Sequence, residues 1–363
     1  MNKPDILFIH LGAHSFVKED LKILGELTNV HEFFFNPKKA RIKPFTLFIL
    51  LWNFIQQFFW LLINIRKAKL IYCWFSDYHG FLPALFSKLT GKPLVTVLGG
   101  FDCIKMPHLG YGIFCSSWRK PIGEFVIRNS ELLLPVDYTL IESNEIAKNW
   151  PDAHPNGLKF NIKNFNTPVR TMPTGYASDV WKSGEADRKK IVSTVAGCST
   201  MQIAYRKGLD LFIESAKLLP DFKFIIVGPS SSLIHEIQRK FDVPSNVEIL
   251  PRQKREDLNA IYTSSSVYTQ LSRAEGLPNV LCEAMMCGCI PVGSPVFGIP
   301  ECIKNTGFVA HHPDPKEIAV LIENAHSKGS EQTRREVRDR IQQEFTLENR
   351  RIALQEVLKN FNA

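Results

Sequence analysis

Apolar residues in this chain fall into short continuous runs that alternate with segments of helical periodicity. The first run covers residues 5–11, is followed by Gly12, and leads into residues 18–27, where apolar positions recur at helical spacing. Short uninterrupted apolar runs are typical of parallel strands that are buried on both faces. Further strand candidates, several of which include polar residues, recur along the whole chain at residues 30–35, 70–75, 94–98, 132–136, 191–196, 224–228, 247–250 and 267–271. This alternation predicts an α/β fold built from doubly wound parallel sheets.

The segments between these runs carry the remaining predictions of secondary structure. Residues 142–150 are expected to be helical, and residues 151–168, which are rich in Pro, Asn and Gly, are expected to form a loop. Residues 206–208 are expected at the start of an amphipathic helix, and residues 348–361 are expected to form the last helix.

Residues 45–65 form the most apolar stretch of the chain and are long enough to cross a bilayer. Within it, polar residues recur at helical spacing and predict a narrow polar stripe on one side of a helix: Thr46, Asn53, Gln57 and Asn64. Basic residues flank the stretch on both sides: Lys38, Lys39, Arg41 and Lys43 before it, and Arg66, Lys67 and Lys69 after it. No acidic residue occurs from residue 33 to residue 76.

This pattern favours a helix that lies on an anionic leaflet over one that spans the membrane. A crossing at this point would put the first α/β unit on the wrong side of the bilayer. A helix buried in the domain is the alternative interpretation of the same residues.

Residues 272–288 predict a loop that leads into a short helix. Pro278 disfavours helix at the residue before it and leaves Asn279 as the N-cap. Val280 to Cys287 then reads as an apolar helix, and Gly288 fits its C′ position. The first N–H groups of such a helix have no partner within the helix, so they form an anion-binding site.

Two acidic residues stand on either side of this predicted anion site. Glu275 lies in the glycine-containing loop before the helix, and Glu283 lies about one turn inside it. The arrangement suits a ligand with an anionic centre and hydroxyl groups at both ends, such as a nucleotide-sugar. Two structural alternatives remain at this point: Ser272 and Glu275 also fit a capping box, and Glu283 also fits a solvated helix position.

The stretch E-G-L-P-N-V-L-C-E-A, with the following G-C-I-P-V and G-I-P-E, closely resembles a known signature. It is similar to the E-x7-E motif of retaining nucleotide-sugar glycosyltransferases with the GT-B fold, of the family 4-like, group 1 type. The resemblance covers about residues 169–345 strongly and the first half weakly. It implies two Rossmann-like domains that face a cleft: residues 1–172 for the acceptor and residues 173–345 for the donor. Residues 346–363 would be a helix that packs back on the first domain.

The resemblance also implies roles for individual residues. Glu275 would bind hydroxyls of the donor sugar, Glu283 would bind the ribose, and Lys207 would bind the leaving diphosphate. Asp102 would contact the acceptor or the anomeric carbon. The wider donor site would comprise Gly12, Arg206, Gly228, Leu250, Arg252, Gly276, Leu277, Pro278, Asn279 and Val280. Gly12 fits a simple tight turn equally well, and a basic residue that opens a helix favours a bound anion because it opposes the helix dipole.

Two positions depart from the pattern of that family. Relatives often have His-Gly-x-Asp where this chain has Gly99-Gly100-Phe101-Asp102, so the imidazole is replaced by Gly99. Cys198 follows the glycine after which relatives place a diphosphate-binding arginine. His79 resembles a frequent upstream histidine, although a lone histidine near a strand end is more often structural. These departures leave open a non-catalytic subunit of a membrane glycan-assembly complex.

Composition and charge narrow the possible domain organisation and the possible classes of function. At 363 residues the chain can form two ordinary domains, and its formal charge of +8 lies mostly in residues 1–175, which hold 20 Lys and Arg against 13 Asp and Glu. No aromatic-basic nucleic-acid module accompanies that surplus. The eight cysteines show no pairing pattern, so they are interpreted as reduced, mostly buried thiols without a zinc site. The first five residues lead directly into a strand, so no signal peptide is expected.

Taken together, these features predict a cytoplasmic retaining glycosyltransferase on the inner face of the membrane. Its donor would be a nucleotide-diphosphate-sugar, and its acceptor a glycan or lipid-linked glycan of cell-surface polysaccharide assembly. The chain has no Asp-x-Asp motif, and neither a metal nor another cofactor is expected. A GT-B sugar-nucleotide epimerase is the enzymatic alternative, which the basic apolar stretch disfavours because an epimerase has no need of a membrane.

Overall fold

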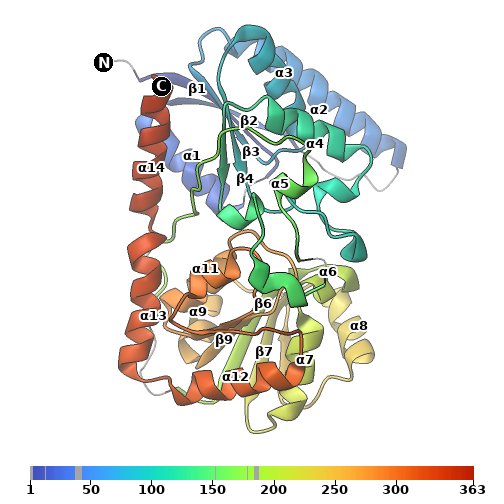
Figure 1. Ribbon diagram of the computed structural model, residues 1–363, viewed down its shortest axis with the longest axis vertical. Helices are drawn as coiled ribbons and strands as arrows, with labels where there is room; N and C mark the ends of the chain where they lie inside the picture. The colour runs from blue at the N-terminus through green and yellow to red at the C-terminus, as the bar shows by residue number, and fades with distance from the viewer. Residues whose placement is uncertain (1–2, 13, 37–42, 152, 178, 184–187) are drawn as a thin grey trace. The chain divides into compact units, whose positions relative to one another are not determined.

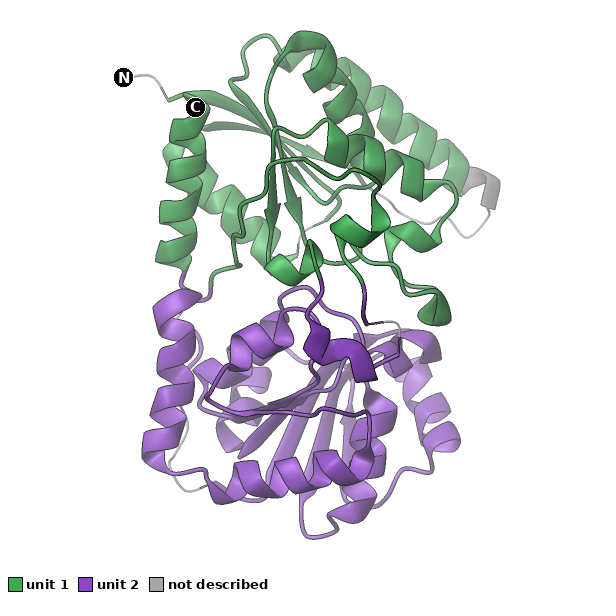
Figure 2. Ribbon diagram, in the orientation of Figure 1, with its two compact units in different colours: residues 1–142, 156–175, 347–363 green, residues 143–155, 176–346 purple. Residues whose placement is uncertain are grey.

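The computed structural model of the chain contains two parallel β-sheets, each flanked by helices (Figure 1). It describes residues 3–12, 14–36, 43–151, 153–177, 179–183 and 188–363. Lys38, Lys39 and Arg41 lie outside these ranges, as does the side chain of Lys43. The chain divides into two compact units (Figure 2). Unit 1 comprises residues 1–142, 156–175 and 347–363, and unit 2 comprises residues 143–155 and 176–346.

Unit 1 is built on a five-stranded parallel sheet with the strand order β2-β1-β3-β4-β5. Its strands are β1 (Asp5–His10), β2 (Asn29–Phe34), β3 (Leu70–Trp74), β4 (Leu94–Leu98) and β5 (Leu132–Pro135). Its helices are α1 (Ser15–Leu27), α2 (Lys43–Asn64), α3 (Phe81–Thr90), α4 (Arg119–Arg128), α5 (Leu158–Asn161) and α14 (Leu347–Asn360). All five residues of β3 and all five of β4 are buried, as the uninterrupted apolar runs predicted.

The last helix, α14, belongs to unit 1 because a buried ion pair anchors it there. Arg350 of α14 contacts Asp20 of α1 at 2.6 Å, with both side chains almost fully buried. The same carboxylate accepts hydrogen bonds from the Tyr72 hydroxyl at 2.7 Å and the Trp74 indole at 2.9 Å. Every charge in this cluster therefore has a partner, which is the condition for burying charge without a large penalty.

Unit 2 contains a six-stranded parallel sheet with the order β11-β10-β9-β6-β7-β8. Its strands are β6 (Ile191–Cys198), β7 (Lys223–Pro229), β8 (Val247–Leu250), β9 (Val267–Gln270), β10 (Ile290–Gly293) and β11 (Phe308–Val309). Its helices are α6 (Met201–Arg206), α7 (Leu209–Leu218), α8 (Ser231–Phe241), α9 (Arg255–Ser264), α10 (Asn279–Met286), α11 (Ile299–Ile303), α12 (Pro315–Ser327) and α13 (Glu331–Glu344). The prediction of doubly wound parallel sheets is confirmed for both units.

Two local predictions were wrong. Residues 142–150 are not an α-helix, and only a short 3₁₀ helix forms over Glu145–Asn149. The loop expected over residues 151–168 contains the single-turn helix α5. The amphipathic helix expected to start at residues 206–208 is α7, which begins at Leu209 with Gly208, at φ 74°, as its N-cap; Arg206 ends the preceding helix α6. All eight cysteines are reduced, and all but Cys115 are buried.

Candidate functional site

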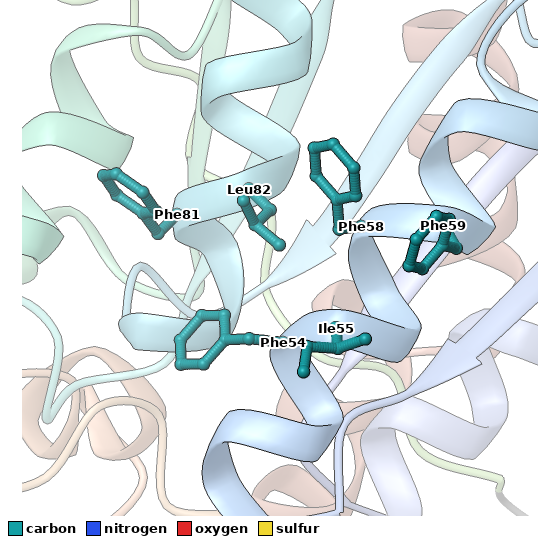
Figure 3. Close-up of a pocket in the computed structure, with 6 residues that line it drawn as sticks. All are labelled: Phe54, Ile55, Phe58, Phe59, Phe81 and Leu82. Atoms are coloured by element: carbon teal, nitrogen blue, oxygen red, sulfur yellow. The ribbon is translucent and has the colours of Figure 1, made fainter.

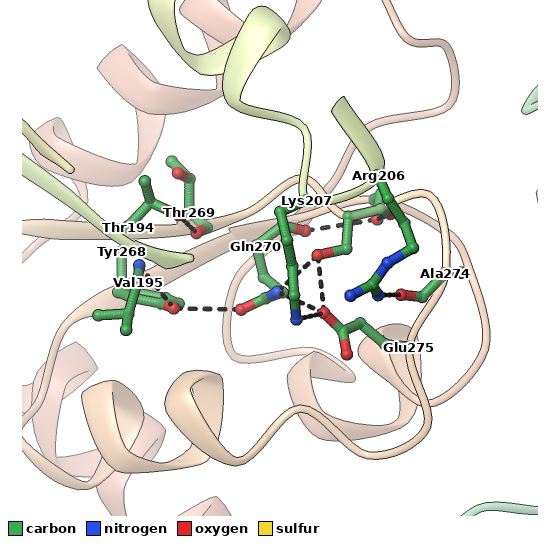
Figure 4. A network of polar contacts seen from close by, with 11 residues as sticks. Thr194, Val195, Arg206, Lys207, Tyr268, Thr269, Gln270, Ala274 and Glu275 are labelled. Carbon is green, nitrogen blue, oxygen red and sulfur yellow. Dashed lines mark hydrogen bonds and ion pairs between the residues drawn. The ribbon is translucent and has the colours of Figure 1, made fainter. Parts of the chain in front are cut away.

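Glu275 lies in the loop that follows β9, at the carboxyl edge of the unit 2 sheet (Figure 4). Its Oε1 atom accepts hydrogen bonds from the Ser272 hydroxyl at 2.8 Å and from the Gln270 amide at 3.3 Å, and it also pairs with Lys207 Nζ. These contacts all end on Oε1, and Oε2 points away from them (Figure 4). The capping-box alternative is wrong, because Ser272 bonds the carboxylate inside a loop and caps no helix.

A line of buried polar groups fixes the orientation of this carboxylate. The backbone N–H of Val195 on β6 donates to the Tyr268 hydroxyl at 3.3 Å, and that hydroxyl donates to the Gln270 Oε1 atom at 3.1 Å. The Gln270 amide must therefore turn its NH₂ group toward Ser272 and Glu275. The central strands β6 and β9 thus position Glu275 at the sheet edge where open α/β folds bind ligands.

Lys207 reaches the site because the α6–α7 junction lies directly against the Glu275 loop. The Arg273 N–H donates to the Arg206 carbonyl at 2.7 Å, and the Arg206 guanidinium donates to the Ala274 carbonyl at 3.0 Å. A Cβ atom on Gly208 would lie 2.1 Å from the Leu271 carbonyl oxygen, so only glycine permits this approach. Arg206 and Lys207 stand at the end of α6, where positive charge suits the helix dipole. Lys207 also directly precedes the N-cap of α7, so the expectation of a bound anion there stays a prediction.

The Glu275–Lys207 pair is largely shielded from solvent, with side chains 12% and 17% exposed. Burial alone would raise the pKa of Glu275, but the charges of Lys207 and Arg206 hold it below its usual value. The carboxylate is therefore ionised at neutral pH. It can accept hydrogen bonds from hydroxyl groups, and Lys207 beside it supplies a positive charge for an anion.

Helix α10 begins at Asn279, one residue earlier than expected, with Pro278 at the N-cap. The prediction of Asn279 as N-cap was wrong: its Oδ1 accepts a hydrogen bond from the Tyr176 hydroxyl at 2.6 Å instead. Proline has no side-chain acceptor, and no side chain caps the helix; the Leu281 N–H donates to the Pro278 carbonyl at 3.1 Å. Gly288 adopts φ 80° just after the C-cap, which confirms its expected C′ position.

Arginines of unit 2 hold the other end of α10. The Arg338 guanidinium donates to the Met286 carbonyl, and the Arg334 guanidinium donates to the Gly288 carbonyl at 3.0 Å. Arg188 donates to the Cys287 carbonyl and, at 2.7 Å, to that of Ser265. Positive charge at a helix C-terminus stabilises it, so these residues fix the helix that carries Glu283. Sequence reasoning missed them, because isolated arginines carry no local signal of the carbonyls they reach.

Glu283 lies in the middle of α10 and is a weakly solvated carboxyl group. Burial raises its pKa to about 8, although the Arg255 charge and the Tyr262 hydroxyl act in the opposite direction. A solvated helix position, the structural alternative for Glu283, does not fit this environment. Whether its carboxyl group binds a ribose stays a prediction.

The other predicted donor residues described below also lie at or just after the carboxyl ends of strands. Gly228 and Leu250 lie near the carboxyl ends of β7 and β8, and Arg252 follows β8 by two residues. Gly12 follows β1 in unit 1. Gly228 adopts φ 116°, and a Cβ atom there would lie 2.9 Å from the Ala196 backbone. Contact of these residues with a donor stays a prediction, as it does for Gly276, Leu277 and Val280.

Asp102 of unit 1 is fully enclosed by backbone donors. Its carboxylate accepts N–H groups of Gly100 at 2.9 Å, Gly99 at 3.1 Å and Ser76 at 3.2 Å. Burial raises the pKa of Asp102 to about 6, against the lowering effect of these bonds. The group therefore ties together the segments that follow β3 and β4, and its contact with an acceptor stays a prediction.

Gly99 stands where the resemblance led us to expect histidine, and the Phe75 ring occupies the space that a side chain there would need. A Cβ atom on Gly99 would lie 2.3 Å from the Phe75 ring. Phe75 itself adopts φ 72°, a strained conformation for an aromatic residue. His79 is buried, contacts the Trp74 carbonyl at 2.7 Å, and has its pKa lowered to about 4 by burial, so it is neutral.

Helix α2 turns its polar stripe inward and its apolar side outward. Gln57 is fully buried and donates to the His79 carbonyl at 2.8 Å, and Asn53 bonds the backbone of Asn36 at 2.9 and 3.1 Å. Large apolar side chains of the helix are 40–72% exposed: Leu47, Phe48, Leu51, Trp52, Ile55, Phe58, Phe59, Leu62 and Ile63. The buried-helix alternative is therefore wrong. By length and hydropathy alone, Thr46–Asn64 could cross a bilayer, a test that core helices and signal sequences also pass.

The part of the chain that the structure describes contains no candidate metal site. There, no group of three or more His, Cys, Asp or Glu side chains is arranged to hold an ion.

Comparison with known proteins identifies a family match within unit 2 and relatives that match about a third of the chain. Residues 178–344 match the family model described as Glycosyl transferases group 1. A phosphatidylinositol N-acetylglucosaminyltransferase subunit of Arabidopsis thaliana is 27% identical over 132 residues, which are 35% of this chain and 30% of that protein. A D-inositol 3-phosphate glycosyltransferase of Mycobacterium sp. (strain KMS) is 28% identical over 138 residues, 36% of this chain and 31% of that protein. The match thus spans about a third of each relative's length.

Solved structures share the fold of the whole chain. A sucrose-phosphate synthase of Thermosynechococcus elongatus superposes with a TM-score of 0.73 and 14% identity, covering 99% of both chains. Anabaena Alr3699/HepE, in complex with UDP and glucose, gives a TM-score of 0.73 and 14% identity, with 98% of this chain and 100% of that chain covered. At this identity the likeness establishes the two-domain α/β fold alone.

Proposed function

We propose that this chain, which carries a group 1 glycosyltransferase domain on a GT-B fold, transfers a sugar from a nucleotide-diphosphate-sugar to an acceptor. The observation that carries the proposal is the shielded Glu275–Lys207 pair beside the N-terminus of α10. The pair offers an ionised carboxylate for sugar hydroxyls and a positive charge for phosphate within one site. The UDP and glucose bound by Alr3699/HepE support a nucleotide-sugar as the donor.

Each group then has a defined part in the reaction. The Oε2 atom of Glu275 accepts hydrogen bonds from hydroxyls of the donor sugar, and Glu283 holds the ribose. Lys207 and the first N–H groups of α10 bind the diphosphate. Negative charge grows on the leaving oxygen as the sugar C1–O bond breaks, so these fixed positive groups stabilise the transition state more than the bound donor. No metal is needed for that effect.

We further propose that transfer retains the anomeric configuration. The acceptor hydroxyl oxygen forms its bond to C1 on the face from which the diphosphate departs, and its proton passes to the leaving diphosphate oxygen. Configuration is then preserved without a carboxylate nucleophile.

The acceptor is a glycan or lipid-linked glycan at an anionic membrane, in assembly of cell-surface polysaccharide. The exposed apolar side of α2 supports this part of the proposal, since a contiguous apolar surface of this kind marks an interaction site. The exposed basic residues Arg66, Lys67 and Lys69 follow the C-terminal end of α2, and they suit anionic headgroups. The Arabidopsis relative is named after a phospholipid, phosphatidylinositol. The protein would then work on the cytoplasmic face of the membrane.

Donor binding and turnover test the enzymatic proposal. UDP-, GDP- and ADP-sugars are titrated by calorimetry, and slow donor hydrolysis is followed in the absence of acceptor. A glycosyltransferase binds one donor class and releases free sugar, whereas an epimerase converts the donor into its epimer. A protein that binds none of them is a non-catalytic component, and the proposal fails. In Glu275→Gln, hydrolysis should fall while the fold, followed by circular dichroism, persists.

Vesicle co-sedimentation tests the membrane proposal separately. The protein should pellet with vesicles of phosphatidylglycerol and phosphatidylcholine, and higher salt should release part of it. Each basic residue near the surface contributes on the order of 1 kcal/mol, an effect that decays over about 10 Å at 0.1 M salt. Replacing the basic residues that flank α2 with Gln should weaken pelleting and leave donor hydrolysis unchanged. A protein that ignores anionic vesicles at low salt has no such surface.

A further inference from the structure

An open apolar groove of about 380 Å³ runs between α2 and α3 in unit 1. Six side chains line it, four from α2 and two from the start of α3: Phe54, Ile55, Phe58, Phe59, Phe81 and Leu82 (Figure 3). None of them carries a polar atom, so the groove offers no hydrogen bond to a sugar, a nucleotide or a phosphate. Its chemistry suits only a hydrocarbon.

The walls of the groove are held by rings that pack into the domain. Phe54 meets the buried Phe35 edge to face, with ring centroids 5.1 Å apart, and Phe58 meets Phe86 in the same way at 5.6 Å. Phe81 lies 5.3 Å from Phe125 of α4. Aromatic pairs in this geometry stabilise one another, so the groove is formed before any ligand arrives.

One end of the groove lies next to the carboxyl edge of the unit 1 sheet. Phe81 follows the segment Asp77–Gly80, which begins three residues after β3 ends. In that segment Asp77 pairs with Arg119, whose guanidinium lies 4.6 Å from the centroid of the Phe101 ring. Polar and cationic groups thus stand at the edge where α/β sheets bind ligands, and the apolar groove opens beside them.

The rest of the groove is continuous with the exposed apolar side of α2. Ile55 and Phe58 line the groove and are each 40% exposed, and Phe59 is 58% exposed. Arg66, Lys67 and Lys69 follow the end of the helix, and no acidic residue occurs from residue 33 to residue 76. A hydrocarbon chain that leaves an anionic leaflet would therefore meet apolar surface along its whole path.

We propose that this groove binds the hydrocarbon chain of the lipid-linked acceptor and delivers the head group to the carboxyl edge of the unit 1 sheet. The inference rests on the proposed function, and it narrows the acceptor from a glycan in general to one carried by an acyl or prenyl chain. Docking of α2 on the membrane and binding of one chain in the groove are separate events, so they can be separated by substitution.

The test uses a single-chain fluorescent amphiphile, 11-(dansylamino)undecanoic acid, titrated below its critical micelle concentration without vesicles. Wild-type protein should bind it saturably at one site, with the blue shift of an apolar environment. Ile55→Trp fills the groove and should weaken binding about tenfold or more, which corresponds to about 1.4 kcal/mol. Ile63→Trp is the matched control: the same change on the same helix, at a residue 72% exposed and outside the groove, should leave binding unchanged.

Further measurements distinguish probe binding in the groove from binding elsewhere and from a misfolded variant. Phe59→Ala removes one wall at an exposed position and should also weaken probe binding, so the conclusion does not depend on one variant. Both Trp variants should still pellet with anionic vesicles and bind the nucleotide-sugar. Absence of saturable binding, or equal loss in Ile55→Trp and Ile63→Trp, overturns the proposal. A wild-type dimer in light scattering that the probe dissociates also overturns it, because a second copy then covers the groove.

The proposed function fails on different evidence. Lack of nucleotide-sugar binding by the wild-type protein refutes glycosyl transfer even where the probe binds the groove. Lack of probe binding with intact donor binding refutes the groove alone.

Discussion

If Glu283 binds the donor ribose as proposed, its raised pKa should make donor binding depend on pH in a predictable direction. Burial raises this pKa from 4.5 to about 8, so at pH 7 about nine in ten of these carboxyl groups are protonated. A carboxylate accepts hydrogen bonds from two ribose hydroxyls, whereas the protonated acid uses one oxygen as a donor. Donor binding should therefore favour the ionised form and release a proton.

The magnitude follows from the distance between the pKa and the working pH. Ionising a group of pKa about 8 at pH 7 costs about 1.4 kcal/mol, and this cost disappears near pH 9. Affinity for the nucleotide-sugar should thus rise about tenfold between pH 7 and pH 9 and level off above the pKa. The stability of the fold should depend on pH with the opposite sign. Because the folded-state pKa is raised, the stability contribution of Glu283 is full below about pH 4.5 and is lost as the pH rises through about 8.

Isothermal titration calorimetry measures both the affinity for the donor and the number of protons released on binding. The ligand is a nucleotide-sugar, because its esterified phosphates do not titrate in this range. Two buffers of different ionisation enthalpy at pH 7 should reveal release of close to one proton. Glu283→Gln should abolish the pH dependence and bind like wild type at pH 7 but about tenfold more weakly at pH 9. Glu275→Gln is the control: the pKa of Glu275 is lowered, so its loss should leave the pH slope intact. An affinity that is flat from pH 7 to pH 9, or a slope that survives in Glu283→Gln, refutes the reasoning.

Three other substitutions have expected outcomes. Lys207→Ala should lower kcat at least tenfold with little effect on binding of the bare nucleoside, since leaving-group charge grows toward the transition state. A kcat within about twofold of wild type, under roughly 0.5 kcal/mol, would show that Lys207 does not bind the diphosphate. Arg350→Met leaves the Asp20 carboxylate buried without a cation, so urea denaturation should show an unfolding free energy lower by roughly 3–5 kcal/mol. Arg351→Met, at a partly exposed ion pair, should lower it by at most about 1 kcal/mol. Gly99→Ala should cost roughly 1–3 kcal/mol through collision with Phe75, and a Phe75→Leu background should recover most of it.

Local chemistry determined the parts of the fold that depend on neighbours in the chain. A continuous apolar run suits a buried parallel strand, and β4 begins and ends at the predicted residues. The half-exposed edge strand β8 also has the predicted bounds. Pro278 and Gly288 bound α10 because one disfavours helix before it and the other accepts a positive φ after it. The same stretch carries Glu275 and Glu283, so the candidate site was found from a single segment.

Groups that meet from distant parts of the chain could be identified only in the tertiary structure. Lys207 and Glu275 are 68 residues apart, and what joins them is the close approach of the α6–α7 junction to the loop after β9, which Gly208 permits. The exclusion of a side chain at Gly99 likewise depends on Phe75, a residue of another strand end.

Helix α2 shows most clearly what the sequence determined and what only the tertiary structure decided. Its sequence determined a long apolar helix with a narrow polar stripe, but periodicity does not say which side faces the solvent. The tertiary structure decided this, because the partners of Asn53 and Gln57 are backbone groups of Asn36 and His79 that only the folded chain brings near. Satisfying these buried amides turns the stripe inward and leaves the aromatic side of the helix exposed.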